Sequence, residues 1–488
     1  STVFSEAELT ELFADVIGQS LTIEEINTLA DRVTQLYLNE GYLTSRAIID
    51  SYADGNIVIG VIEGKVTEII IESPPEKKTR LEKYVRSRVK LGSRTPLKAK
   101  KLEDQLRLLK NDPLIENIEA SLRAGEKQGE SIVVVRVTDA DNWTGRIGID
   151  NYSPPSIGSE RLNLALAYRN LTGIGDTIGF SFTPRTANLD TFQLQFNYLA
   201  PLNPMNGTLA LSTIIDRNEV IQEPFDVLDI EGEAEQYDIT YRQPLVRNPR
   251  QEFALSLGFS YRDGQTFTFA GPTPFGLGPS DEGETTISVI KFGQDYTIRQ
   301  EDGAWAFRSL LNFGVDLFDS TENSGSTPDS QFLSWLGQIQ RVQVLDDDNF
   351  LIIGLDLQLS NDPLLAAQQF VIGGGQSVRG YRQNVLAGDN GFRFSIEDRI
   401  TVQRDEAENA ILQIAPFIDM GAVWNAKDNP NGIVEDQTFI IALGLGFIWE
   451  PVEGFNIRLD YAPPLIELDS KGENVQDHGF YFNATYSF

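Results

Sequence analysis

The sequence predicts a transmembrane antiparallel β-barrel of sixteen strands, preceded by two small α/β domains. From about Asn142 onward, apolar and polar residues alternate with a period of two, which is typical of strands with one lipid-facing and one water-facing side. No run of about 18 apolar residues occurs in the sequence, so a closed sheet is the remaining route across a bilayer. Before that point the apolar spacing is helical. We therefore expect three segments, 1–64, 65–139 and 140–488.

The last nine residues carry the clearest membrane strand. One face would hold Phe480, Phe482, Ala484, Tyr486 and Phe488, and the other Tyr481, Asn483, Thr485 and Ser487. The same alternation recurs upstream, most clearly in Phe439, Ile441, Leu443, Leu445, Phe447 and Trp449. Aromatic residues there bracket aliphatic ones, as in the interfacial girdles of membrane barrels.

The links between the expected strands alternate between short and long. Short links fall near 171–175, 245–250, 301–303 and 346–349, and long ones at 217–232, 263–283, 320–330 and, longest, 361–388. This alternation is typical of barrels with short periplasmic turns and long extracellular loops, and an even number of strands closes antiparallel. Both termini and the two N-terminal domains are then expected in the periplasm.

The first domain begins with two helices. Ser5 with Glu8 and Thr22 with Glu25 form capping-box signatures, and Gly41 occupies a position that favours the left-handed residue after a helix. Two strands should follow at 46–49 and 57–62, with a turn at 54–56.

The second domain repeats the unit with one more strand. We expect a strand at 66–71, a helix at 81–89, a helix capped by Thr95 with Pro96 in its first turn, and strands at 115–122 and 132–137. The first copy lacks the leading strand, so we expect residues upstream of Ser1 to supply it. Ser1 opens without a signal peptide, which indicates a processed or trimmed chain.

Composition excludes several function classes. The chain has no cysteine and one histidine, His478, which leaves no thiol nucleophile, disulfide or zinc-finger site and disfavours an enzyme. A net charge of −31 argues against nucleic-acid binding. No cofactor or metal site is expected. The acidic run Asp346-Asp347-Asp348 could suggest calcium, but a solvated turn is the preferred interpretation.

One segment is basic in this acidic chain. Positions 77–110 hold thirteen lysine and arginine residues against three acids, and Lys98, Lys100 and Lys101 are a candidate basic patch. A solvated helix face is the first interpretation, and contact with an anionic partner is the second.

The longest loop carries the candidate functional motif. Val378, Arg379, Gly380 and Tyr381 lie in it, behind three glycines at 373–375 that allow the backbone to fold back. These glycines lack the Gly-Lys-Ser/Thr end of a nucleotide-binding loop. In Phe417-Ile418-Asp419-Met420-Gly421, period-two alternation points Asp419 into the lumen. A loop folded into the barrel would bring the Arg379 guanidinium to that carboxylate.

These motifs carry a resemblance to a known family. Residues 378–381 resemble the VRGY/F signature of the sixth loop in the Omp85 superfamily, and Phe417, Asp419 and Gly421 resemble its partner motif on the thirteenth strand. Gly391 to Glu397 resembles the glycine-to-glutamate motif of the twelfth strand, and the N-terminal repeats resemble POTRA domains. The arrangement of two POTRA domains before a sixteen-strand barrel resembles that of the TpsB transporters of two-partner secretion. The chain departs from that pattern in its incomplete first POTRA domain and in lacking the N-terminal plug helix that members often carry.

The resemblance implies export of an unfolded TpsA exoprotein across the outer membrane of a Gram-negative-type bacterium. The POTRA domains would bind the N-terminal secretion domain of that exoprotein, the barrel would be a monomer surrounded by outer-membrane lipid, and no nucleotide would be hydrolysed. The alternative within the superfamily is an insertase that assembles outer-membrane β-barrels. A passive porin would leave the N-terminal domains and residues 378–381 unexplained, and an outer-membrane enzyme would have only His478 as a histidine base.

Overall fold

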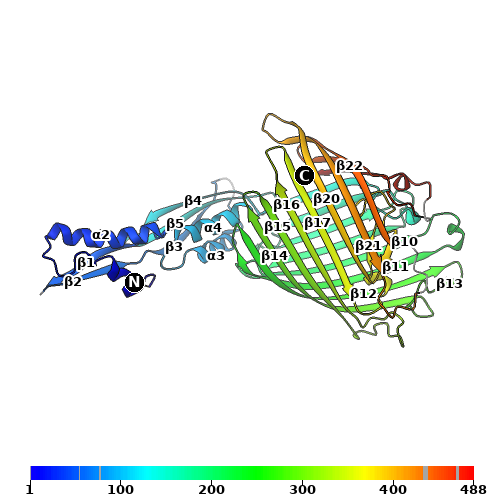
Figure 1. Ribbon diagram of the computed structural model, residues 1–488, viewed down its shortest axis with the longest axis horizontal. Helices are drawn as coiled ribbons and strands as arrows, with labels where there is room; N and C mark the ends of the chain where they lie inside the picture. The colour runs from blue at the N-terminus through cyan, green and yellow to red at the C-terminus, as the bar shows by residue number, and fades with distance from the viewer. Residues whose placement is uncertain (1, 54, 76–77, 432–437, 469–471) are drawn as a thin grey trace. The chain divides into compact units, whose positions relative to one another are not determined.

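The computed structural model describes residues 2–53, 55–75, 78–431, 438–468 and 472–488. The chain forms two compact units, one of Ser1–Asn142 with Asn170–Gly175 and one of Trp143–Arg169 with Asp176–Phe488 (Figure 1). Every α-helix of the described residues lies in the first unit. None of the helices in those residues combines the length and the apolar character needed to cross a membrane.

The first unit starts with two helices and a hairpin. Its elements are α1 (Glu6–Glu11), α2 (Ile23–Asn39), β1 (Arg46–Ala53) and β2 (Asn56–Ile62). Both predicted capping boxes are present. The Ser5 hydroxyl accepts from the Glu8 backbone N–H, and the Glu8 carboxylate accepts from the Ser5 backbone N–H. Thr22 and Glu25 form the same two hydrogen bonds. Gly41 has a φ of +85°, as a left-handed residue after α2 requires. Asp54, part of the predicted turn, lies outside the described residues.

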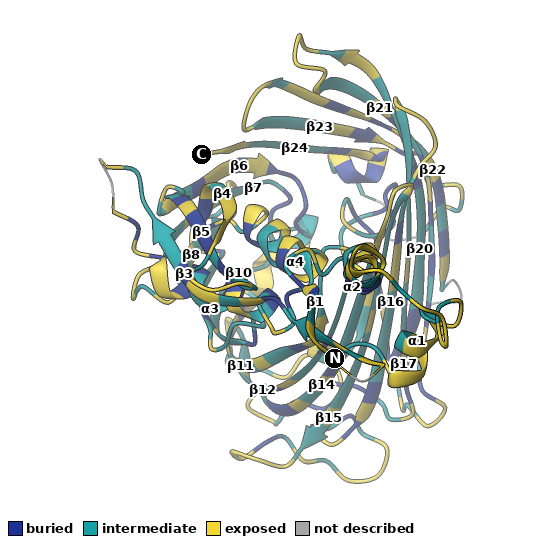
Figure 2. Cartoon of the chain, turned by 90° about the vertical axis from the view of Figure 1, so that its left-hand side faces the viewer, coloured by how far each residue is buried: buried dark blue, intermediate teal, exposed yellow. Residues whose placement is uncertain are grey.

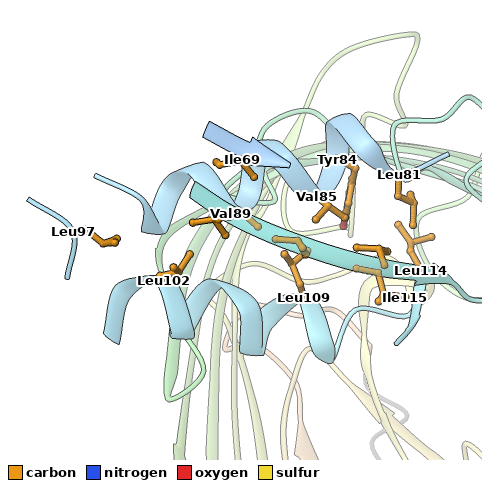
Figure 3. Packing of buried hydrophobic residues seen from close by; sticks show 13 residues of the cluster. Ile69, Leu81, Tyr84, Val85, Val89, Leu97, Leu102, Leu109, Leu114 and Ile115 are labelled. Atoms are coloured by element: carbon orange, nitrogen blue, oxygen red, sulfur yellow. The ribbon is translucent and has the colours of Figure 1, made fainter. Parts of the chain in front are cut away.

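The rest of the first unit is a three-stranded sheet with two helices. It contains β3 (Lys65–Glu72), α3 (Glu82–Gly92), α4 (Ala99–Lys110), β4 (Ile115–Ala124) and β5 (Glu130–Asp139). The strand order is β3-β5-β4, with β3 parallel and β4 antiparallel to β5. Buried Val85 and Val89 of α3 and Leu102 and Leu109 of α4 form its core together with β5 (Figure 3). The 3.6-residue apolar spacing of the two helices therefore has its physical cause in this shared core.

The start of α4 corrects one prediction. The helix begins at Ala99 with Lys98 as its N-cap, and neither Thr95 nor Pro96 belongs to it. The side chain of Leu97 is buried, and its backbone N–H donates to the Gly64 carbonyl oxygen at 2.8 Å. That bond to the link between β2 and β3 holds Leu97 outside the helix.

The second unit is a closed antiparallel barrel of sixteen main strands, which confirms the predicted fold class (Figure 2). The strands are β6 (Trp143–Asp150), β7 (Arg161–Arg169), β8 (Thr177–Pro184), β9 (Phe192–Pro201), β10 (Thr208–Glu219), β11 (Glu231–Arg247), β12 (Gln251–Thr268), β14 (Glu284–Gln300), β15 (Gly303–Val315), β16 (Leu333–Val344), β17 (Asn349–Ser360), β20 (Asn390–Arg404), β21 (Ala410–Trp424), β22 (Phe439–Val452), β23 (Phe455–Tyr461) and β24 (Phe480–Ser487). The ring closes where β24 pairs with β6. The two-residue strand β13 (Gly271–Pro272) pairs only with β12.

Side chains alternate between the outer and inner surfaces of the barrel. In β22, Leu443 and Leu445 are 53% and 52% exposed, whereas their neighbours Ala442 and Gly446 are buried. Large apolar side chains left exposed in this order need a hydrocarbon environment. The outer face of the ring is therefore the membrane face.

Most links alternate between short and long as predicted, but the links 170–176 and 185–191 are equally long. The shortest join β14 to β15 at 301–302 and β22 to β23 at 453–454, and the longest joins β17 to β20 at 361–389. We call residues 361–389 the lumen loop, because its contacts, described next, are with inward-facing side chains. It contains its own small hairpin of β18 (Phe370–Ile372) and β19 (Leu386–Gly388).

Candidate functional site

The lumen loop folds back on itself at its glycines. Gly373, Gly374 and Gly380 have φ values of +108°, +97° and +98°, a region that side chains with a Cβ rarely adopt. Val378 between them is completely buried, in a cluster with Ile372 of the loop and inward-facing wall residues. The loop is thus packed against the wall rather than suspended in the lumen.

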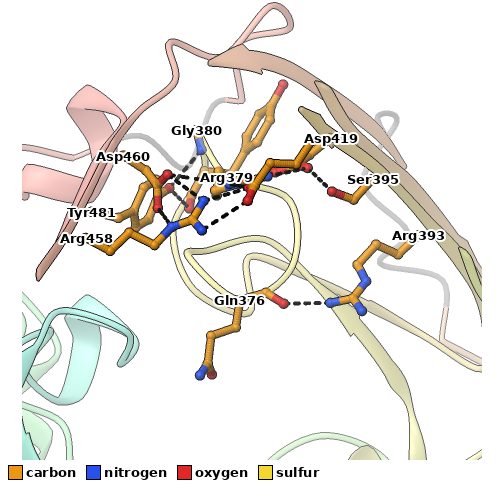
Figure 4. Close-up of polar contacts among 11 residues, drawn as sticks. Gln376, Arg379, Gly380, Arg393, Ser395, Asp419, Arg458, Asp460 and Tyr481 are labelled. Atoms are coloured by element: carbon orange, nitrogen blue, oxygen red, sulfur yellow. Dashed lines mark hydrogen bonds and ion pairs between the residues drawn. The ribbon is translucent and has the colours of Figure 1, made fainter. Parts of the chain in front are cut away.

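Arg379 is held by three carboxylates of the barrel wall (Figure 4). Its Nε lies 2.6 Å from Asp419 Oδ2 and its Nη2 lies 3.0 Å from Asp419 Oδ1, a bidentate pair. Its Nη1 lies 2.7 Å from Glu397 Oε2 and 3.5 Å from Asp460 Oδ1. The Arg379 side chain is only 7% exposed. The structure therefore brings together Arg379, Asp419 and Glu397, all three named from the sequence.

The carboxylates are balanced by further guanidinium groups. Arg458 of β23 donates to both Glu397 and Asp460 at 2.7 Å, and Arg399 donates to Glu397 at 2.8 Å. Three arginines thus face three acids, of which only Arg379 belongs to the loop. Removing one partner from a buried network of this kind destabilises the protein by about 3–5 kcal/mol, because the remaining charge is left buried without a partner. The loop and wall are consequently fixed together by charge as well as by packing.

The Phe417 ring stacks against the Arg379 guanidinium. The Arg379 Cζ lies 3.2 Å from the centroid of the Phe417 ring, which is a cation–π contact. The ring in turn fills the space where a side chain on Gly444 of the next strand would stand. A glycine at 444 is therefore what lets Phe417 lie beneath Arg379.

The other motif glycines make room for the loop. A Cβ on Gly421 would stand 2.8 Å from the Phe392 carbonyl oxygen and 3.3 Å from Val378 Cγ2. A Cβ on Gly391 would overlap the ring of Phe370. Both positions lie on the inner face of the wall, and both permit close approach of the loop.

Gly380 and Tyr381 tie the loop to two more strands. The backbone N–H of Gly380 donates to the Tyr481 hydroxyl at 3.0 Å, and that hydroxyl donates to the Tyr381 carbonyl oxygen at 2.5 Å. The Tyr381 hydroxyl donates to the Ile441 carbonyl oxygen at 2.8 Å. All four residues of the 378–381 motif therefore contact the wall.

Arg382 connects the lumen loop to the link before the last strand. Its Nη2 lies 2.8 Å from Asp477 Oδ2, within the short helix Val475–His478. Burial opposes ionisation of Asp477, but the hydrogen bonds from Arg382 and from backbone N–H groups outweigh it and lower the pKa of Asp477. This second bidentate pair fixes the loop at a point beyond the motif.

Asp389 holds the base of the loop. It is completely buried, and its Oδ1 accepts from the backbone N–H of Leu364 at 2.9 Å and from Gln369 Nε2 at 3.2 Å. Its Oδ2 accepts from the Ala426 N–H at 2.8 Å and from Asn429 Nδ2 at 2.6 Å. One carboxylate thus joins both ends of the loop to the link that follows β21.

Asp460, Arg458 and Asp389 were not named from the sequence, and Tyr481 was placed on the polar face of the last strand but not in the site. The first two carried a usable signal, because Ile457, Leu459 and Tyr461 alternate with them and point outward, so Arg458 and Asp460 point inward. Tyr481 lies on the inward face for the same reason. Asp389 gave no periodic signal, since it lies between strands.

The basic patch belongs to the first unit and is separate from this site. Lys98 lies 3.7 Å from Glu40 and 5.3 Å from the centroid of the Tyr42 ring, and Lys100 and Lys101 are exposed on α4. Lys77, at the start of the basic segment, lies outside the described residues. The patch is therefore a partly exposed helix face with one tethered lysine.

The remaining candidates have local roles. Asp346 accepts hydrogen bonds from the backbone N–H groups of Asp348 and Asn349, as expected for a tight turn. Over the described ranges, no group of three or more histidine, aspartate and glutamate side chains is arranged to hold a metal ion. His478 is exposed at the end of its short helix.

Comparison with known proteins gives a consistent family. The model of the haemolysin secretion/activation protein ShlB/FhaC/HecB family matches residues 129–447, and that of the ShlB-type POTRA domain matches residues 1–64. The outer membrane transporter CdiB of Dickeya dadantii (strain 3937) is 24% identical over 400 residues, covering 80% of this chain and 69% of CdiB. The heme/hemopexin transporter protein HuxB of Haemophilus influenzae (strain 86-028NP) is 20% identical over 492 residues, covering 99% of this chain and 84% of HuxB.

A solved structure shows the same fold. CdiB from Escherichia coli superposes with a TM-score of 0.79 at 19% identity, covering 100% of this chain and 89% of that one. Together with the family match over residues 129–447, the barrel and the lumen loop decide the assignment. The chain belongs to the haemolysin secretion/activation protein family, the TpsB outer-membrane transporters of the Omp85 superfamily.

Proposed function

We propose that this protein exports an unfolded TpsA-type exoprotein through its barrel, and that the Arg379 network holds the lumen loop in the position that export requires. The observation that carries the proposal is the placement of Arg379 against Asp419, Glu397 and Asp460 inside the barrel. A passive porin would leave the POTRA region and the docked 378–381 motif unexplained. Membership in a family of outer-membrane transporters supports a secreted polypeptide as the cargo.

The POTRA region would receive the cargo in the periplasm by strand addition. In its three-stranded sheet, β3 and β4 are both edge strands, and β1 and β2 form a sheet of their own. Edge strands leave backbone groups free for pairing with an extended chain, and such pairing tolerates varied side chains. An unfolded N-terminal secretion domain is a suitable partner for this mode.

Movement would need no nucleotide. The cargo would pass as an extended chain along the wall of a monomeric barrel and fold outside, which makes return unfavourable. Purification of the barrel as a monomer in detergent, and passage of the exoprotein through the barrel reconstituted in vesicles without added nucleotide, would agree with this mechanism.

The test is secretion by strains carrying Arg379→Ala or Arg379→Lys. Alanine removes the guanidinium and should nearly abolish appearance of the exoprotein in the medium, while lysine keeps the charge but not the bidentate geometry and should restore export in part. Heat-modifiable migration of the barrel on gels controls for assembly. Normal export from an assembled Arg379→Ala barrel would overturn the role given to the loop.

Deletion of the whole protein separates export from barrel insertion. Loss of one large exoprotein from the medium, with an unchanged outer-membrane proteome, is the expected result. A broad loss of outer-membrane barrels would instead favour the insertase.

A further inference from the structure

A cavity of about 270 Å³ lies inside the barrel, where β11, β12 and β14 meet the root of the lumen loop. It is at the rim that carries the long links. The residues that matter for its chemistry are Ala234, Arg262, Gly264, Thr285, Leu365 and Ala366. Most of these are small or apolar, so the one cation among them sets the character of the site.

Arg262 forms no ion pair with any residue that the structure describes. Among the described residues, no hydrogen bond or ion pair reaches its guanidinium, although it points inward between Tyr261 and Asp263 of the outer face. Asp216 is near enough to act on it electrostatically but forms no ion pair with it. The Asp216 carboxylate instead accepts from Gln193 at 3.1 Å and from Asn218 at 3.4 Å.

Several other inward-facing cations are paired with acids. Arg242 lies 2.8 Å from Glu252, Lys291 lies 3.1 Å from Asp238, and Arg393 pairs with Asp356. Arg185 forms no ion pair within the described residues, but its guanidinium donates to the Ser153 hydroxyl and to the Thr183 carbonyl oxygen. Arg262 differs from these cations in having neither kind of partner among the described residues. A confined guanidinium gains most from an anionic partner that brings its own lone pairs.

The cavity itself offers Arg262 no such partner. Glu233 also lines it, but the Glu233 carboxylate lies 3.6 Å from Arg217. The amide of Gln265 donates to the Glu282 carbonyl oxygen. The carboxylate and amide groups of this lining are therefore engaged, and the Arg262 guanidinium remains available to a ligand.

We propose that this cavity binds the carboxylate of an aspartate or glutamate side chain on the polypeptide in transit, with Arg262 as its anchor. This rests on the proposed export function. A volume of about 270 Å³ accommodates one side chain and its backbone but not a folded domain. The planar guanidinium matches a carboxylate in bidentate geometry, and the apolar walls shield that pair from water.

A chain bound in this cavity would also contact the lumen loop. Leu365 and Ala366 belong to that loop, and Leu364 and Leu365 pack on Ile287 and Val289 of β14. A chain bound here touches the wall and the loop at once. Binding would therefore stabilise the arrangement in which the loop root stays docked.

Cysteine reactivity tests the site directly, because the chain has no cysteine of its own. Ala366→Cys is introduced into the full-length purified protein, and its rates of modification by an anionic sulfonatoethyl and a cationic trimethylammonioethyl methanethiosulfonate are compared. Arg262→Gln should lower the anionic-to-cationic rate ratio by about fivefold, since it removes the local positive potential. The matched control is Arg308→Gln, which removes an arginine 3.9 Å from Asp295 elsewhere on the inner wall and should leave the ratio unchanged.

Protection by ligands identifies the occupant. An acetylated glutamate-rich peptide should slow modification of the Ala366→Cys protein and lose this effect with Arg262→Gln, while the matched glutamine peptide should give no protection. Equal protection by both peptides, or a rate ratio unaffected by Arg262→Gln, would overturn the proposal. If N-acetylglutamate protected the cysteine at the same concentration as the peptide does, the proposal that the occupant is a polypeptide would be overturned. None of these readouts uses secretion, so they fail or succeed independently of the Arg379 test.

Discussion

The Asp419 carboxylate accepts hydrogen bonds from both the backbone and the side chain of Arg379, a residue 40 positions earlier in the chain. Its Oδ1 also accepts from Ser395 at 2.6 Å. One buried carboxylate thus sets the position of the loop backbone as well as of its guanidinium. The contact therefore joins the longest link to the inner wall through both the backbone and the side chain of one residue.

Asp419→Asn tests whether the charge or the shape of that contact matters. The amide is nearly the same size, but it carries no charge and its NH₂ group faces the guanidinium donors. We expect a loss of about 3 kcal/mol or more in loop anchoring, together with strongly reduced export from a barrel that still assembles. Secretion assays and the temperature at which the folded form disappears on gels measure the two effects. Wild-type values for both would show that Glu397 and Asp460 suffice for Arg379.

Gly421→Val tests the packing of the loop against the wall. The added side chain would press on Val378 and Ile372, and overpacking of this kind typically costs about 1–3 kcal/mol. Limited proteolysis of the loop in the purified protein should become faster. Gly354→Ala is the matched control on a barrel strand, because a Cβ there meets nothing within 4 Å, and its proteolysis rate should equal that of the wild type.

Asp389→Ala tests the base of the loop. Four donors would lose their acceptor, and each unsatisfied buried group costs about 1–3 kcal/mol, so we expect faster amide hydrogen exchange at Leu364 and Ala426. Asp389→Asn keeps one acceptor oxygen and should lie between the alanine variant and the wild type. Equal exchange in all three proteins would mean that the two ends of the loop are held by packing alone.

The Arg382–Asp477 pair gives a pH prediction. Because the pKa of Asp477 is lowered on folding, the pair stabilises the loop above the ordinary aspartate pKa of about 3.9 and loses that effect as the pH falls through the lower folded value. Protease resistance of the loop should therefore stay constant from neutral pH down to about 4 and decline below it. Asp477→Asn should be less resistant at neutral pH and should lack this decline.

Much of this architecture could be predicted because it depends on periodicity. Alternation places Leu443 and Leu445 outside and Asp419 inside whatever the exact register, since each strand has only two faces. The same rule places Arg458 and Asp460 of β23 on the inner face. The charge balance of the network could not be predicted, because it depends on which strands lie side by side.

Two features needed the three-dimensional structure. The Thr95-Pro96 pair is a good helix start on local grounds, yet Leu97 bonds to Gly64 and the helix begins later. Gly421 belongs to the motif named from the sequence and Gly444 does not, but the purpose of either glycine is visible only when Val378 and Phe417 occupy the space beside them. Local patterns cannot report contacts between segments far apart in the chain.

The six charges of the Arg379 network are divided unequally between the lumen loop and the barrel wall, and this division has a further electrostatic effect. Glu397, Asp419 and Asp460 stay on the strands with Arg399 and Arg458, whereas Arg379 would leave with the loop. Any excursion of that segment would thus uncover a wall with one surplus negative charge. A sodium ion or a lysine of a passing chain is the natural temporary substitute, and the return of the loop would have to displace it.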